Sequence, residues 1–164
     1  MPASEKHATF SIRKATDADA QGILECLRAA FEKYRDSYTP EAFLDTVCTT
    51  ETIGRRLRDM AVFVGTSDTG QIVGTVACGV VDEEEGHVRG MAVRPEWQGA
   101  GLATELLRCV EAELYGRRCS RISLDTTAPL ERAMRFYEKN GFHRTGKVTD
   151  FFGMPLFEYE KTRQ

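Results

Sequence analysis

Two glycines separated by one residue, Gly99 and Gly101, stand where a strand-like pattern of apolar residues gives way to a helical one. Glycine leaves the main chain uncovered, and the first N–H groups of a helix have no partner within the helix. Together with the positive end of the helix dipole, such N–H groups bind anions, above all phosphates. The turn therefore predicts a site for a phosphate-bearing ligand.

Several kinds of glycine turn compete for this interpretation. The glycine turn does not match a P-loop, because it contains no Lys followed by Ser or Thr to reach terminal phosphates and magnesium. The dinucleotide fingerprint fits poorly, since Thr104 stands where a third small residue is needed and "RPEWQ" separates the strand from Gly99. Asp125, placed like a ribose ligand, keeps that alternative open, as does a purely conformational role for both glycines.

The elements that must position this turn follow from hydrophobic periodicity and turn residues. Alternating and β-branched segments predict strands at 10–13, 60–66, 71–81, 87–93, 121–127, 142–147 and 155–161. Apolar stripes predict helices at 17–35, 40–58, 103–114 and 129–140. With residues 1–9 expected to be flexible, residues 10–164 form one domain of the α/β class (α+β type), with about seven strands and about four helices.

Composition narrows the function. The net charge is −3, so neither a nucleic-acid interface nor a charged membrane patch is indicated. No apolar stretch has the ~18 residues that a membrane span needs, and no signal peptide is visible. Five cysteines without a C-x-x-C pair are typical of buried thiols and give no zinc site. We expect a cytoplasmic protein without a metal.

Three segments resemble a known family. Gln98-x-x-Gly101-x-Ala103 is similar to the Q/R-x-x-G-x-G/A motif of the GNAT superfamily of N-acetyltransferases, which use acetyl-coenzyme A. Upstream, "MAVRPEW" resembles the family's fourth strand and the turn after it, and downstream "AMRFYEKNGF" resembles its closing helix. The resemblance covers residues 10–161 in element order, and it implies that strands four and five are splayed to admit the cofactor.

The resemblance also implies how acetyl-coenzyme A binds. The pyrophosphate is expected on the main-chain amides of 99–104, and the pantetheine arm on the main chain of 91–93, beside a bulge near Gly90. Many relatives have an Asn where this chain has Leu130, so one contact is missing; Arg132 and Arg135 are candidates to compensate, or simply a solvated helix face. The implied cofactor-binding residues are Met91, Ala92, Val93, Gln98, Gly99, Ala100, Gly101, Leu102, Ala103 and Thr104.

The expected chemistry is attack of an amine on the thioester. By resemblance, Tyr137 is the partner of the leaving thiolate, although its helical spacing also suits a core residue. An ammonium with a pKa of about 10.4 needs a base at neutral pH. His87 and Glu85 are the candidates, and a polar strand residue or a solvated turn, including Glu83 and Glu84, is the alternative.

The acceptor is expected to be a primary amine on a small molecule or peptide, walled by 17–35, 40–58 and the loop near 148–154. Nearby acidic residues favour a cationic amine. Aromatic side chains there suit packing as well as binding: Phe31, Tyr34, Tyr38, Phe151 and Phe152. A non-catalytic coenzyme A-binding sensor or interaction module is the alternative function, and both monomer and homodimer remain open.

Overall fold

The computed structural model describes residues 9–163, so that the predicted flexible segment 1–9 lies, apart from Thr9, outside the described residues. The strands are β1 Phe10–Lys14, β2 Ala61–Ser67, β3 Ile72–Val80, β4 Glu85–Val93, β5 Arg121–Thr127, β6 His143–Phe151 and β7 Met154–Thr162. The α-helices are α1 Ala20–Phe31, α2 Pro40–Val47, α3 Thr50–Asp59, α4 Leu102–Gly116 and α5 Glu131–Lys139. Short 3₁₀ segments are η1 Asp17–Asp19, η2 Glu32–Ser37 and η3 Pro95–Trp97.

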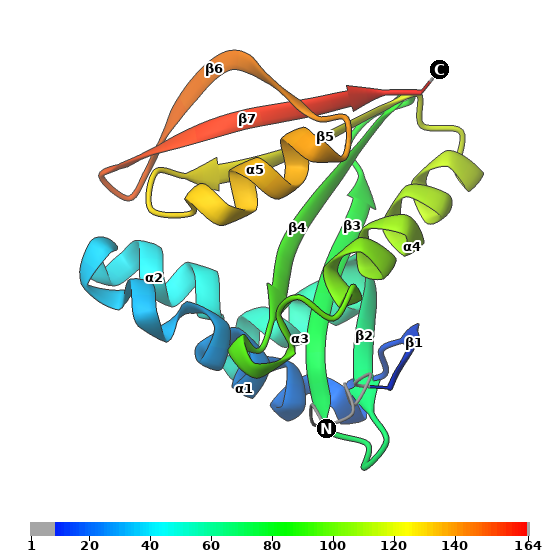
Figure 1. The fold of residues 1–164 in the computed structure, drawn as a ribbon. Coiled ribbons are helices and arrows are strands. Elements are labelled where there is room, and N and C mark those ends of the chain that lie inside the picture. Colours follow the sequence, from blue (N-terminus) through cyan, green and yellow to red (C-terminus); the bar gives the residue numbers. More distant parts are fainter. Residues whose placement is uncertain (1–8, 164) are drawn as a thin grey trace, which may run out of the picture.

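The seven strands form one mixed sheet in the order β1-β2-β3-β4-β5-β7-β6. Only β4 and β5 are parallel neighbours, and they pair over four positions, from Glu85 opposite Arg121 to Val88 opposite Leu124. Beyond these positions the two strands separate, so the sheet opens into a V in Figure 1. The expected seven strands and the splay of strands four and five are confirmed.

A bulge in β4 lies where the strand leaves β5. Ala77 of β3 lies opposite Arg89 and Thr75 lies opposite Ala92, so β4 has one residue more than β3 in this interval. Gly90 takes a φ of 67° there, a left-handed conformation that favours glycine. The bulge near Gly90 is therefore confirmed, and it turns the end of β4 away from its parallel partner.

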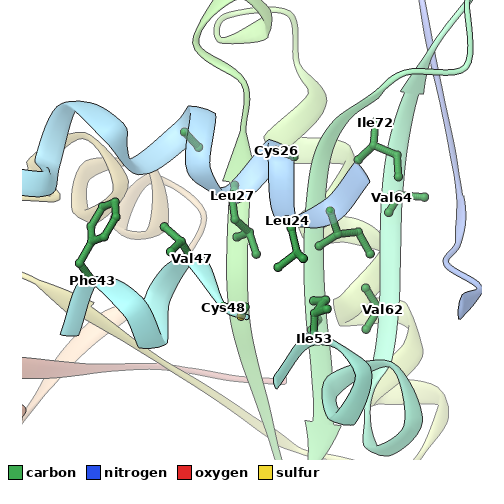
Figure 2. Close-up of a cluster of buried hydrophobic side chains, with 14 of the residues drawn as sticks. Leu24, Cys26, Leu27, Phe43, Val47, Cys48, Ile53, Val62, Val64 and Ile72 are labelled. Carbon is green, nitrogen blue, oxygen red and sulfur yellow. The ribbon is translucent and has the colours of Figure 1, made fainter. Parts of the chain in front are cut away.

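Two apolar clusters cover the two faces of the sheet. Figure 2 shows the cluster beneath the N-terminal helices, where Leu24 and Leu27 of α1 and Ile53 of α3 pack against Val62 and Val64 of β2. The other face packs against α4 and α5, with the buried side chains Leu102, Leu106, Leu107, Val110, Leu114, Ile122, Leu124 and Tyr137. Burial of such side chains contributes roughly 1.5–3 kcal/mol each, and it fixes β4 between two helical layers.

The predicted helix 40–58 is two helices in the structure. Cys48, between α2 and α3, has a φ of 66°, and this left-handed residue ends α2. Thr39 and Thr49 each accept a hydrogen bond from an N–H of the first turn that follows, so each helix has its own N-cap. The expectation of about four helices was therefore low by one.

Three boundaries differ from the sequence prediction. The expected loop near 148–154 is mostly strand, because β6 continues to Phe151 and a two-residue turn leads into β7. Pro129 precedes α5 instead of lying in its first turn, since Leu130 is the N-cap. Helix 17–35 is α1 flanked by 3₁₀ turns. Within residues 9–163, no helix has the length and apolar character needed to span a membrane.

Candidate functional site

A cavity of about 560 Å³ lies where β4 and β5 separate. Its wall combines the end of β4, the end of β5, the N-terminus of α4 and one face of α5. The N-terminal helices close its other end through Phe31, Tyr38 and Arg56. The cavity therefore reaches both faces of the sheet, which two reacting molecules require if they enter from opposite sides.

The glycine turn presents bare main chain to this cavity. Gly99 and Gly101 have φ values of 85° and 84°, and a Cβ added to either would meet no atom within 4 Å. Gly101 is the N-cap of α4, and no side chain caps the N–H groups of the first turn. The space and the free donors suit an anion. All the predicted cofactor-binding residues except Ala100 line the cavity.

The main chain of β4 offers a second set of donors and acceptors. After Val88 no residue of β4 has a partner on β5, and the bulge residues Gly90 and Met91 have none on β3. Met91, Ala92 and Val93 line the cavity along this open edge. An extended amide chain can pair with such an edge as an added strand would.

A buried hydroxyl in the cavity wall has no partner. Thr126 of β5 is 2% exposed, and among the described residues its Oγ1 is the one buried side-chain polar atom without a hydrogen bond. Leaving a buried hydroxyl unsatisfied costs about 1–3 kcal/mol. Because Thr126 lines the cavity, a bound ligand with amide groups can supply this partner. The wall thus fits the amide-rich arm of coenzyme A.

Tyr137 of α5 lies in the cavity wall with 6% of its surface exposed. Its ring packs edge-on against Phe136 and Phe142. Burial raises the pKa of Tyr137, because the phenolate is poorly solvated there. The phenol therefore remains protonated at neutral pH and can donate a hydrogen bond to an anion in the cavity.

His87 of β4 also lines the cavity, and each of its ring nitrogens faces a polar side chain. Ser123 Oγ lies 2.8 Å from His87 Nδ1 and 3.2 Å from Glu85 Oε2. When the Ser123 hydroxyl proton is donated to Glu85, which only accepts, Ser123 accepts from His87 Nδ1–H and the lone pair is on Nε2. When the hydroxyl proton is donated to His87 Nδ1, the hydrogen is on Nε2 instead. Nε2 lies 3.5 Å from Asp125 Oδ2.

Burial dominates the electrostatics of this pair. It lowers the pKa of His87, and Arg89 acts in the same direction, whereas Asp125 and Glu158 oppose the shift. It raises the pKa of Asp125, and the charge of His87 opposes that shift. A neutral imidazole at pH 7 can accept a proton at Nε2, and the carboxylate beside it stabilises the imidazolium that results.

The predicted candidate Glu85 does not line the cavity. Its carboxylate pairs with Arg121 and accepts from Ser123, so the structure places it behind His87. Glu83 and Glu84 lie exposed in the turn before β4. The structure thus brings His87 and Tyr137 into one cavity and keeps the glutamates out of it. No group of three His, Cys, Asp or Glu side chains within residues 9–163 is placed to hold a metal ion.

Two hydrogen bonds tie the N-terminal helices across the mouth of the V. Tyr38 Oη lies 2.7 Å from Thr127 Oγ1 of β5. Thr39 Oγ1 donates to the carbonyl of Phe152, in the turn between β6 and β7, at 2.8 Å. Phe152 itself is half exposed and does not line the cavity, whereas the other predicted aromatic residues do: Phe31, Tyr34, Tyr38 and Phe151.

Sequence reasoning missed several polar residues of the site. Ser123, Asp125 and Thr127 alternate along β5, and this period of two was a usable signal that they share a face. For Asp125 the sequence suggests only the role of a ribose ligand in another fold. No sequence pattern indicated that Arg56 faces the site, because exposed and cavity-facing arginines cannot be distinguished in the basic segment of α3.

Comparison with known proteins gives consistent matches. The model of the acetyltransferase (GNAT) family matches residues 21–142. A solved structure of PaiA N-acetyltransferase from Thermoplasma acidophilum in complex with coenzyme A is 19% identical, with a TM-score of 0.78 over 94% of this chain and 99% of that chain. The ribosomal-protein-S18-alanine N-acetyltransferase of Escherichia coli is 17% identical, with a TM-score of 0.74 over 94% of each chain.

A third similar structure is the ribosomal-protein-alanine N-acetyltransferase of Brucella melitensis, which is 23% identical, with a TM-score of 0.71 over 93% of this chain and 99% of that chain. At such identities the structural similarity shows a shared fold. The family match extends from α1 to the end of α5 and includes the glycine turn, β4 and Tyr137.

Proposed function

This chain belongs to the GNAT acetyltransferase family, and from that premise we propose that it transfers an acetyl group from acetyl-coenzyme A directly to a primary amine. Both substrates would be bound together in a ternary complex. One observation carries the proposal: a single cavity joins the bare main chain of the glycine turn, the phenol of Tyr137 and the imidazole of His87.

The cofactor end uses main-chain groups. The free N–H groups at the start of α4 would hold the pyrophosphate, helped by the positive end of a 15-residue helix. The open edge of β4 would pair with the pantetheine arm, and Thr126 Oγ1 would meet one of its amides in place of the Asn that Leu130 replaces. Acetyl-coenzyme A, when bound, supplies an activated acetyl thioester.

The acceptor end would supply the base. Holding an amine of pKa about 10.4 in its neutral form at pH 7 costs roughly 4.6 kcal/mol. His87 Nε2 takes the proton, directly or through one water, while Ser123 holds the Nδ1–H and Asp125 stabilises the positive charge. Ser123 and Asp125 therefore act through His87, the first as a positioning residue.

The reaction balances with these groups. The ammonium first loses one proton to His87, which releases it to solvent. The neutral nitrogen then bonds to the acetyl carbon, the carbon–sulfur bond breaks, and the second proton of the nitrogen also leaves through His87 as the amide forms. A main-chain N–H at the β4 bulge, that of Met91 or Ala92, would donate to the carbonyl oxygen as it gains charge. Tyr137 would donate its hydrogen bond or proton to the departing sulfur and recover a proton from solvent.

A panel of primary amines, assayed by thiol release from acetyl-coenzyme A, tests the proposal. We expect Tyr137→Phe to lower kcat by about 10²-fold and His87→Gln to lower kcat/KM by a similar factor. Binding of coenzyme A to either variant should stay within about twofold, because the main chain of the glycine turn and of β4 is assigned most contacts with the cofactor and Tyr137 only the one to its sulfur.

The matched control is Tyr159→Phe. Tyr159 is also a buried tyrosine, but its hydroxyl donates to Glu138 and it does not line the cavity. Wild-type turnover by Tyr137→Phe would remove Tyr137 from the mechanism. Tight binding of coenzyme A without thiol release on any amine would favour the alternative, a non-catalytic binding module.

A further inference from the structure

Arg56 of α3 directs its guanidinium at the bulge of β4. A Cβ added to Gly90 would collide with Arg56 Nη1, so the planar head group lies directly over the main chain of Gly90. Arg56 lines the cavity on the side of the N-terminal helices, the same side as Tyr38 and Asp45. Its charge is thus held at the acceptor end, next to the strand that also carries His87.

Within residues 9–163, the Arg56 side chain makes no hydrogen bond and has no carboxylate within 4.0 Å. Asp45 of α2 is the carboxylate that acts on Arg56, and it already pairs with Arg89 at 3.8 Å. Arg56, Arg89 and Asp45 therefore carry one uncompensated positive charge between them. Burial lowers the pKa of Arg56, which shows that the head group is poorly solvated where it stands.

An acidic group lies a short way along the sheet. Asp125 Oδ2 of β5 is 3.5 Å from His87 Nε2, and burial, which lowers the pKa of His87, favours the neutral imidazole. His87 and Gly90 lie three residues apart on the same strand, and His87 and Arg56 line the same cavity. A small molecule in this cavity can therefore face both groups, and a compact zwitterion matches their charges.

We infer that the acceptor is an amine that also carries a carboxylate a few bonds away, an α- or β-amino acid. Arg56 receives the carboxylate and His87 receives the proton of the ammonium. An arginine fork matches a carboxylate with two parallel N–H donors, and burial strengthens the contact. A peptide N-terminus has an amide where the amino acid has this carboxylate, so it would leave Arg56 unpaired.

This inference rests on the proposed function, and its test uses matched acceptors. The free amino acids and β-alanine are compared with their C-terminal amides by thiol release from acetyl-coenzyme A. The best acid should exceed its amide in kcat/KM by at least about 10-fold, the smallest effect of one charge-assisted contact. In Arg56→Met this ratio should fall to within about threefold of unity, mainly through KM.

The matched control is Arg55→Met, which removes the exposed arginine next to Arg56 from the same helix, outside the cavity. It should keep the wild-type ratio. The ratio of kcat/KM for the acid to that for its amide is also measured on the wild-type protein, so this part of the test remains valid even if Arg56→Met fails to fold. If wild-type enzyme uses acids and amides equally, the inference is overturned while the proposed function stands.

Calorimetry separates failure of the inference from failure of the proposed function. The N-acetylated amino acids and their amides are titrated into the protein saturated with coenzyme A. If no amine is acetylated, yet an N-acetyl amino acid binds at least about 10-fold tighter than its amide in wild type only, the carboxylate site stands and the proposed function fails. Absence of both turnover and such a preference overturns both.

Discussion

At the scale of single residues, the cavity differs from the core by leaving strong hydrogen-bonding groups without partners. Arg56 has no counter-ion among the described residues, and Thr126 Oγ1 has no acceptor or donor there. Native interiors satisfy such groups almost everywhere. Both exceptions line one cavity, so a ligand with a carboxylate and amides would satisfy them when it binds.

Thr126→Val tests this view with effects of opposite sign. Removing an unsatisfied buried hydroxyl should raise the free energy of unfolding of the unliganded protein by about 1 kcal/mol. Coenzyme A should bind about fivefold more weakly, because one hydrogen bond to it is lost. Chemical denaturation and calorimetry measure the two effects.

Thr75→Val is the control for that substitution. Thr75 is equally buried, but its hydroxyl donates to the Phe63 carbonyl at 3.0 Å and it does not line the cavity. It should lose about 1 kcal/mol of stability and bind coenzyme A normally. Unchanged affinity in Thr126→Val would show that the cofactor makes no contact there.

Candidate site residues were predictable where a local sequence motif indicates them. They were not predictable where only tertiary packing brings them to the site. Tyr137 and the glycine turn were identified by local sequence, and His87 was a candidate from its place on β4. Glu85 was a candidate on the same grounds, yet the structure turns it toward Arg121. The position of a side chain along its strand does not show which residues of the neighbouring strands it will contact.

At the scale of elements, the turn into α4 is the part of the chain that the cofactor would contact most. Gly101 combines a left-handed φ with open space around its missing side chain. The backbone conformation of Gly101 and the open space beside it therefore restrict the residue type for different reasons. A substitution affects stability through the first and ligand affinity through the second, and the two effects can be measured separately.

Gly101→Ala should lower the free energy of unfolding by about 1 kcal/mol, since alanine at this φ is strained. It should also weaken coenzyme A binding by about 10-fold or more, because the methyl group enters the space assigned to the pyrophosphate; one lost charge-assisted contact already accounts for 10-fold. Thermal unfolding and calorimetry check the two effects.

Gly70→Ala provides the comparison. Gly70, in the turn between β2 and β3, has a φ of 86° and the same open surroundings, and it does not line the cavity. The stability loss should be equal in the two variants, and only Gly101→Ala should lose affinity. Equal affinities would mean that the turn does not touch the ligand.

The order of elements was largely readable from the sequence because strand and helix periods differ. The break between α2 and α3 was not. Cys48 takes a left-handed conformation that its residue type does not favour, and it is imposed by packing of both helices under the sheet. The extension of β6 to Phe151 likewise depends on its pairing with β7.

At the scale of the whole molecule, the two halves of the sheet are joined by only four parallel pairs between β4 and β5. Behind these pairs, Arg121 of β5 gathers Glu85 of β4 with Glu158 and Glu160 of β7. This charged cluster and the Tyr38–Thr127 hydrogen bond hold the V together while its open end remains available to ligands.

A carboxylate beside the end of the N-terminal strand affects the stability of the domain through its protonation. Asp19 accepts from Arg13 Nη1 at 2.7 Å and from the Thr16 N–H at 2.8 Å. The Arg13 hydrogen bond lowers the pKa of Asp19 to about 2. Because the folded-state pKa is depressed from 3.8, this stabilisation is present above about pH 4 and lost as the pH falls through about 2.

Asp19→Asn should therefore cost about 1–2 kcal/mol at pH 7, discounted for the half-exposed Arg13. The difference from wild type should shrink below pH 4 and vanish near pH 2. Urea unfolding across this range measures it. Asp17→Asn, which removes the same charge from the exposed side of the same turn, should show no comparable change.

The sequence by itself determined the order of strands and helices, the glycine turn at the start of α4 and the place of Tyr137 in its helix, because each depends on residues close together in the chain. The tertiary structure alone decided which polar groups meet. Arg56, Gly90, His87, Ser123 and Asp125 come from three elements, and their charges and proton positions exist only once the sheet opens between β4 and β5. Burial and distance set those properties, and neither is defined until the chain is folded.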